Sequence, residues 1–235
     1  MRSVLNTVSL ATLVGMAVVA PSRAQTAGGF LLGPAASGSL TIDSTNDPSI
    51  KGWTIVLSGC GMSLASAETC AGSEVIPTVS NTGIGITLSL VFESSTGGPL
   101  LTSGGTNRSD MAANITVTAP TGLNIYEAEV NVNGSDPTFP SRGIVVSQTV
   151  TTTVVEPGIS TNPTNSPTLQ SQTFAPINAV SAGTDFLAGT SNGTENATMN
   201  AATVAYTAVP EPVSSSLLTV GLAGLGFVRR KIRKG

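Results

Sequence analysis

The chain has 235 residues, with ten lysines and arginines against thirteen aspartates and glutamates, for a formal net charge of −3 at pH 7. It contains no histidine, so Ser-His-Asp and Cys-His catalytic sites and histidine-bound zinc are excluded. Between positions 25 and 208, three basic residues stand against twelve acidic ones, a net charge of −9, so no basic patch for nucleic acid is expected there.

The first 24 residues predict a secretory signal peptide. Arg2 precedes an apolar run over 8–20, a length typical of a signal peptide and short for a membrane span. Pro21 ends the run, and Ser22 and Ala24 place small residues at the two positions that signal peptidase reads. We therefore expect cleavage after Ala24 and export of the rest of the chain; an uncleaved N-terminal anchor is the alternative.

Residues 25–155 are predicted to form an antiparallel β-sandwich, and hence an all-β body. Several segments alternate apolar and polar residues with the period of two that is typical of a half-buried strand. The clearest are 84–92 and 144–154, and shorter ones are 39–43, 53–58 and 114–118. Turns rich in Gly, Pro and Asn separate these segments, a spacing that favours a sandwich. A β-solenoid is the structural alternative, although no fixed repeat supports it.

The predicted strand over 123–133 changes face along its length. Leu123 and Ile125 share one parity, whereas Ala128 and Val130 share the other. A switch near Tyr126 indicates a β-bulge, or a strand that crosses between two sheets.

The two cysteines, Cys60 and Cys70, are predicted to form a disulfide, the usual state of a cysteine pair in an exported chain. A metal pair or a reactive thiol are the alternatives, and the chain has neither the histidine nor the CxxC motif that would complete a zinc site.

Residues 156–208 are predicted to form a connection rich in Pro, Ser, Thr and Asn, because four prolines fall between 156 and 183. A final strand is expected over 198–207, where Ala202, Val204 and Tyr206 alternate with other residues. The alternative is a stalk that leads into the C-terminal tail.

The tail, 209–235, has three parts: a short proline motif, an uncharged apolar stretch over 213–228, and a basic end over 229–235. The motif consists of Val209, Pro210, Glu211 and Pro212. The basic end contains Arg229, Arg230, Lys231, Arg233 and Lys234. A helix over 213–228 spans about 24 Å, less than the roughly 30 Å of the hydrocarbon core, and long basic side chains can make up the difference. The positive charge predicts a single transmembrane helix with its basic end in the cytoplasm and the body outside.

These three parts together resemble the PEP-CTERM sorting signal. The resemblance is confined to the tail and rests on Pro210, Glu211, Pro212, the apolar helix and the arginine-rich end. It implies recognition by an exosortase, cleavage near the motif, and transient residence in the inner membrane before release to the cell surface or extracellular matrix. It also implies association with extracellular polysaccharide or biofilm. A plain single-pass anchor that is never processed is the alternative.

Few residues predict chemistry. Glu127 and Glu129 would share one strand face about 7 Å apart, a spacing that suits a glycosidase pair, although a solvated face explains them better. Asp43, Asn46 and Asp47 could supply oxygen ligands to calcium, but hydrogen bonds within a turn explain them equally well. We therefore expect no catalytic residue, no metal site and no cofactor.

The leading functional hypothesis is a non-enzymatic surface or matrix protein, with signal peptidase and exosortase as processing partners. A carbohydrate-binding module is the main alternative, and a flat face that presents Trp53 or Tyr126 beside Asn and Asp would favour it. A secreted hydrolase would require Glu127 or Glu129 to meet a carboxylate from another strand.

Overall fold

The structure is a computed structural model that describes residues 29–64, 68–82, 85–104, 108–135, 144–151, 159–161, 169–189 and 196–211. The predicted signal peptide, Pro212, the tail helix over 213–228 and the basic end lie outside the described residues. Among the described residues, no helix is both long enough and apolar enough to cross a membrane.

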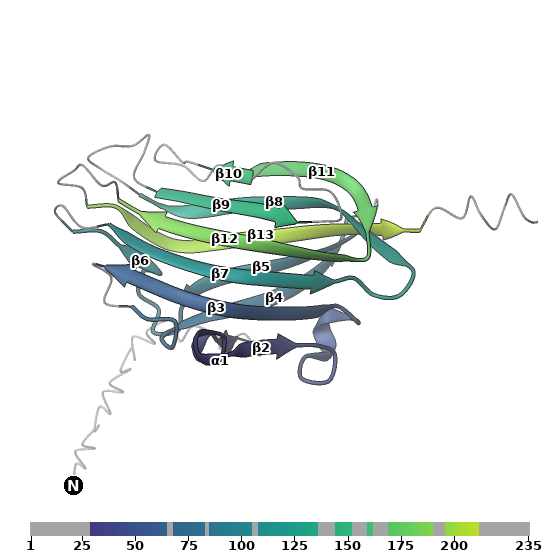
Figure 1. Cartoon of the computed structure of the whole chain (residues 1–235), viewed down its shortest axis with the longest axis horizontal. Helices are drawn as coiled ribbons and strands as arrows, with labels where there is room; N and C mark the ends of the chain where they lie inside the picture. Colours follow the sequence, from purple (N-terminus) through teal and green to yellow (C-terminus); the bar gives the residue numbers. More distant parts are fainter. Residues whose placement is uncertain are drawn as a thin grey trace, which may run out of the picture.

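Two antiparallel β-sheets pack face to face (Figure 1). In the described part of the chain, sheet A has the strand order β1 (Phe30–Leu31), β4 (Ser73–Asn81), β5 (Ile86–Ser94), β13 (Thr198–Pro210), β8 (Leu123–Ser135) and β11 (Gln170–Ile177), and β6 (Leu101–Thr102) also pairs with β13. The C-terminal strand β13 therefore lies inside sheet A, between β5 and β8.

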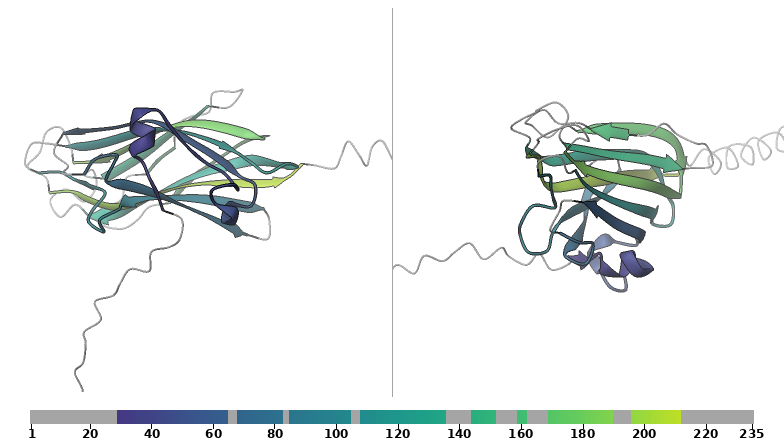
Figure 2. Two further views of the ribbon diagram at one scale, coloured as in Figure 1. Left: turned by 90° about the horizontal axis from the view of Figure 1, so that it is seen from below. Right: turned by 60° about the vertical axis from the view of Figure 1, so that its left-hand side comes forward.

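Sheet B has the order β10 (Ile159–Thr161), β9 (Ile144–Thr151), β12 (Ala179–Ala188), β7 (Ser109–Thr118), β3 (Thr54–Leu64) and β2 (Ser39–Ile42). Helix α1 (Gly33–Ser37) and the 3-10 turn η1 (Pro48–Ile50) flank β2 at that edge of the sandwich (Figure 2). The expected all-β sandwich is confirmed.

The core lies between the inner faces of the two sheets. Phe92 of β5 and Phe186 of β12 meet across it with ring centroids 5.0 Å apart, and both side chains are fully buried. Polar groups also meet in the core: the Gln148 amide of β9 donates a 2.7 Å hydrogen bond to the Tyr206 hydroxyl of β13 and a 3.2 Å bond to the Thr184 hydroxyl of β12. Sheet A and sheet B are thus joined by an aromatic pair and by a buried hydrogen bond.

The predicted strands are present with shifted ends. The segment expected over 84–92 is β5, that over 144–154 is β9, and the shorter candidates lie in β2, β3 and β7. Alternation predicts burial correctly in β5, where Leu88, Leu90 and Phe92 are fully buried. Trp53, just before β3, is also fully buried, so it is part of the core and cannot stack on a ligand.

The predicted face switch in β8 is a β-bulge. Ile125 pairs with Ala208 of β13 and Glu127 pairs with Thr207, so Tyr126 is the additional residue. Ile125 and Ala128 are both fully buried. An odd-numbered and an even-numbered position thus face the core on either side of the bulge, as the sequence predicts. The alternative, a strand that crosses between sheets, is wrong, because β8 stays in sheet A.

The prediction of a long connection over 156–208 is wrong except at its end. The described part contains β10, β11 and β12, and the expected last strand is β13. The inward face of β12 carries Val180, Ala182, Thr184, Phe186 and Ala188, all buried. These residues are mostly small, so their alternation is weak on a hydropathy scale, but β12 is paired along both edges, with β7 and with β9. The sandwich therefore extends well beyond position 155.

The disulfide between Cys60 and Cys70 is confirmed. It links β3 of sheet B to the turn that precedes β4 of sheet A. Cys60 faces the core because β3 has a bulge beside β7: Ser58 pairs with Asn114, while Gly61 pairs with Ala112. Gly59 adopts the left-handed conformation (φ 63°) that this bulge needs and that side chains disfavour.

Candidate functional site

The predicted sorting motif is partly built into the sandwich. Val209 pairs with Asn124 and Pro210 with Leu123 of β8, and the Glu211 N–H donates a 3.0 Å hydrogen bond to the Gly122 carbonyl oxygen. The backbone is extended at Val209 and Pro210, where it forms the end of β13 in sheet A. The motif therefore follows the folded body without an intervening linker.

The second candidate, the carboxylate pair of β8, lies on the outer face of sheet A. Glu127 and Glu129 are both half-exposed, beside Tyr126 at the bulge. Partial burial and the Glu127 carboxylate raise the pKa of Glu129, and the pKa of the Tyr126 hydroxyl rises for the same two reasons. Their cross-strand partners on β11 and β13 are threonine, serine and alanine, so among the described residues no carboxylate of another strand lies directly opposite either glutamate.

The turn at 43–47 uses its side-chain oxygens internally. Asp43 Oδ1 accepts a 2.8 Å hydrogen bond from the Thr45 N–H, and Asn46 Oδ1 accepts a 2.9 Å bond from the Asp43 N–H. Asp47 Oδ1 accepts bonds from the backbone and the hydroxyl of Ser49 at the start of η1. The bond from Thr45 lowers the pKa of Asp43. Over the described residues, no group of three or more Cys, Asp or Glu could hold a metal ion.

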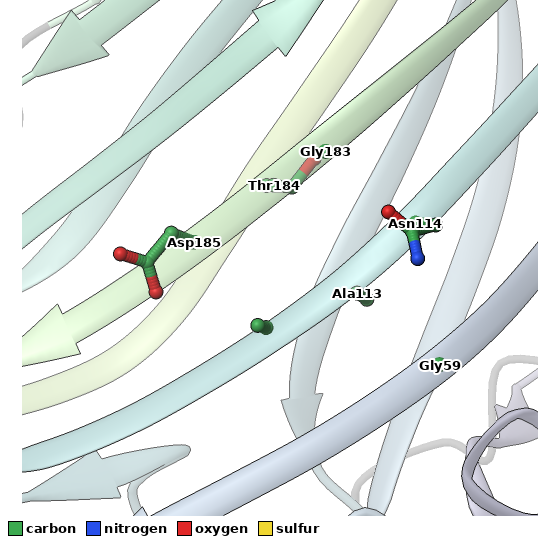
Figure 3. A pocket seen from close by; sticks show the side chains of 7 residues that line it. Gly59, Ala113, Asn114, Gly183, Thr184 and Asp185 are labelled. Carbon is green, nitrogen blue, oxygen red and sulfur yellow. The ribbon is translucent and has the colours of Figure 1, made fainter.

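The third site was not predicted from the sequence: a shallow hollow of about 250 Å³ on the outer face of sheet B (Figure 3). Three adjacent strands, β3, β7 and β12, contribute its lining. The lining residues are Gly59, Ala112, Ala113, Asn114, Gly183, Thr184 and Asp185. Glycine and alanine form the floor, so the backbone of the sheet lies close to whatever enters.

Asn114 is the central polar group of the hollow, and two glycines flank it. A Cβ atom at Gly59 would lie 3.0 Å from Asn114 Nδ2, and one at Gly183 would lie 3.8 Å from Asn114 Oδ1. Figure 3 shows the carboxamide oxygen directed towards Gly183 and the nitrogen towards Gly59. Within the described chain, no hydrogen bond joins the Asn114 carboxamide to a protein group, so its donors and acceptor remain available to a ligand.

Asp185 supplies the second polar group and lies directly opposite Ala112 of β7. Its pKa is raised to about 6, first by partial loss of water around the carboxyl group and then by a hydrogen bond to Asp110 and the charge of Asp110. Arg108 opposes this effect. The carboxyl group of Asp185 can therefore accept or donate a hydrogen bond near neutral pH, depending on its protonation.

The hollow therefore has a floor of small side chains, with the neutral amide of Asn114 and the carboxyl group of Asp185 above it. Such a site can bind a polar, uncharged molecule through several hydrogen bonds. Alternation in 109–118 would have placed Asp110, Ala112 and Asn114 on one outward face, because Met111, Ala113, Ile115 and Val117 are apolar. The contribution of β12 cannot be predicted in this way, because the composition of 156–208 favours a connection over a strand.

No protein-family model matches the sequence, and no curated protein matches it. Among solved structures, the carbohydrate-binding module TmCBM61 in complex with β-1,4-galactotriose is similar at 7% identity, over 64% of this chain and 88% of that chain, with a TM-score of 0.29. A family 11 carbohydrate-binding module from Clostridium thermocellum, in complex with a mixed-linked tetrasaccharide, is similar at 9% identity over 74% and 98%, with a TM-score of 0.23. Tailspike protein 4 of bacteriophage CBA120 is similar at 12% identity over 66% and 19%, with a TM-score of 0.27. Scores this low assign neither a family nor a function.

Proposed function

We propose that this chain is an exported, non-enzymatic surface or matrix protein that binds polysaccharide in the hollow on the outer face of sheet B. The observation that supports this most directly is the exposed Asn114 carboxamide, set between Gly59 and Gly183 over a floor without large side chains. The proposal unites the two leading hypotheses from the sequence, a matrix protein and a carbohydrate-binding module.

The chemistry of the hollow suits sugars. Each sugar hydroxyl can donate and accept hydrogen bonds, as can the Asn114 carboxamide, and the Asp185 carboxylate makes a stronger, charge-assisted bond. The glycine floor lets the face of a sugar ring approach the backbone closely. Recognition here depends on hydrogen bonds, because the described residues that line the hollow include no aromatic side chain.

The route to the cell surface is the second part of the proposal and rests on the two ends of the sequence. Signal peptidase removes 1–24, the tail holds the protein in the inner membrane, and an exosortase cuts near Val209, Pro210, Glu211 and Pro212. Because β13 continues to Pro210, a cut upstream of this strand would remove a central strand from sheet A. The mature protein is therefore expected to keep all of β13.

The binding test uses the full-length protein on native gels that contain a neutral β-glucan, a galactan, or the polysaccharide of the producing culture. At least one polymer is expected to retard the protein, and Asn114→Ala is expected to abolish most of the retardation. Asn200→Ala is the matched control, because Asn200 is exposed on β13 of the other sheet. Unretarded migration in all three polymers would contradict the proposal.

The sorting test is the intact mass of the protein recovered from its own host, with and without the tail-processing enzyme. We expect a mass that lacks both ends in the first background and retains the tail in the second. An intact basic end in both backgrounds would leave a single-pass membrane protein that is not processed.

A further inference from the structure

The hollow is the middle of a longer band of short side chains that crosses the strands of sheet B. In one row, hydrogen-bonded pairing aligns Ser147 of β9, Asp185 of β12, Ala112 of β7 and Gly61 of β3. The neighbouring row aligns Thr149, Gly183, Asn114 and Ser58 of β3. All eight residues point outward, because each is next to a buried residue on its own strand: Leu57, Cys60, Ala113, Gln148 or Thr184.

The band is open at its β3 end. A Cβ atom at Gly61 would meet no heavy atom within 4 Å. At the other end, Ser147 and Thr149 are short and at least partly exposed. Four strands are separated by three spacings of about 4.8 Å, so the band is about 14 Å long across the sheet.

Along the strands, by contrast, larger or mutually bonded side chains limit the band. On one side lie Leu187 and its partner Val145, together with Asp110. On the other side, the hydroxyl groups of Thr116 and Ser181 lie 3.0 Å apart in a hydrogen bond. An extended molecule in the hollow can therefore continue across the strands, but it meets taller groups along them.

We infer that the band binds the interior of an extended polysaccharide chain that runs across β9, β12, β7 and β3. This inference rests on the proposed function and specifies its ligand: several consecutive sugar units of a polymer, bound without recognition of a chain end. Asn114 and Asp185 bond the central units, while Gly61 leaves room for the chain to leave the sheet.

A length series of oligosaccharides, prepared from whichever polymer retards the protein, tests the inference by isothermal titration calorimetry. Affinity is expected to rise at least tenfold from the disaccharide to an oligomer that spans about 14 Å, and then to level off. Modification of the reducing end of a long oligomer is expected to leave affinity unchanged.

Gly61→Leu provides the structural test, because it places a bulky side chain in the open end of the band, where an added Cβ atom meets no heavy atom within 4 Å. It is expected to lower the affinity for the long oligomer at least fivefold and to leave disaccharide binding unchanged. Gly104→Leu is the matched control: a Cβ atom at Gly104 also meets nothing within 4 Å, and Gly104 lies outside the band.

Two results separate the inference from the proposed function. Equal affinity for short and long oligomers, or full-strength binding of the long oligomer by Gly61→Leu, would overturn the inference and leave polysaccharide binding in place. A wild-type protein that binds no oligomer and no polymer would overturn both.

Discussion

The disulfide makes a quantitative prediction about stability. Cys60 and Cys70 are ten positions apart, and both are buried. Closing a loop of this length removes about 9 cal/mol/K of entropy from the unfolded chain, which corresponds to about 2.7 kcal/mol at 25 °C. For a chain of this size, such a loss of stability corresponds to a fall in Tm of roughly 5–10 °C.

The assay is urea denaturation at 25 °C of the full-length protein in detergent, followed by tryptophan fluorescence from buried Trp53. Wild type with reductant, and the double variant Cys60→Ala/Cys70→Ala without it, are both expected to unfold at lower urea concentration than the oxidised wild type. The double variant is the control for the reductant, to which it should be insensitive. An unfolding midpoint that is the same with and without the crosslink would refute the loop-closure reasoning.

Three further predictions concern the aromatic pair in the core, the carboxyl groups of Asp185 and Asp110, and the last strand, β13. Phe186→Ala removes the partner of Phe92 and is expected to lower the free energy of unfolding by about 3–5 kcal/mol. Phe186→Leu leaves a smaller cavity and should cost less. Equal losses of stability in the two variants would show that cavity volume does not determine the cost. The pKa of Asp185 is raised from 3.8 to about 6, so ionisation is penalised in the folded state: the penalty is absent below pH 3.8 and complete above pH 6. Asp185→Asn is therefore expected to stabilise the protein by about 1 kcal/mol at pH 7.5, after allowance for solvent screening, and by nothing at pH 3.5; a pH-independent difference would contradict the coupling to Asp110. A chain that stops after position 197 lacks β13 and should give no cooperative unfolding transition, whereas one that stops after Glu211 should retain it; cooperative melting of the shorter chain would refute the central place of β13.

Several features of the fold could be predicted because they depend on neighbours in the sequence. Alternation placed Leu88 and Phe92 in the core, and the change of parity around Tyr126 located the bulge in β8. The pairing of Cys60 with Cys70 could be predicted because the sequence has two cysteines and a predicted signal peptide. For the buried alternation and the bulge, the signal lies within a dozen residues.

The strands between 159 and 188 could not be predicted, for two physical reasons. Their inward residues include Ala182 and Thr184, whose small side chains give little contrast with the outward ones. The four prolines between 156 and 183, together with many Ser, Thr and Asn residues, also favour a connection over strands in this region. These strands are held by partners elsewhere in the chain: β10 pairs with β9, β11 with β8, and β12 with both β7 and β9. Such long-range pairing is not visible in local patterns.

The hollow could not be predicted for the same reason. Asn114 and Gly183 are neighbours only through the register of β7 with β12, and Gly59 joins them only through a bulge opposite β7. Read singly, Asn114 is an exposed polar residue on a strand. The site exists because pairing places a glycine on each side of it.

The central claim is that this outer face of sheet B binds polysaccharide, and the most direct test is mapping of amide chemical shifts by NMR on the isotope-labelled full-length protein. The probe is a neutral β-glucan tetrasaccharide or a fragment of the polysaccharide of the producing culture. The account predicts that shifts concentrate at Gly61, Asn114 and Gly183 on sheet B. Shifts confined to Tyr126 and Glu129 on the outer face of sheet A, or no shifts at saturating concentrations, would contradict it.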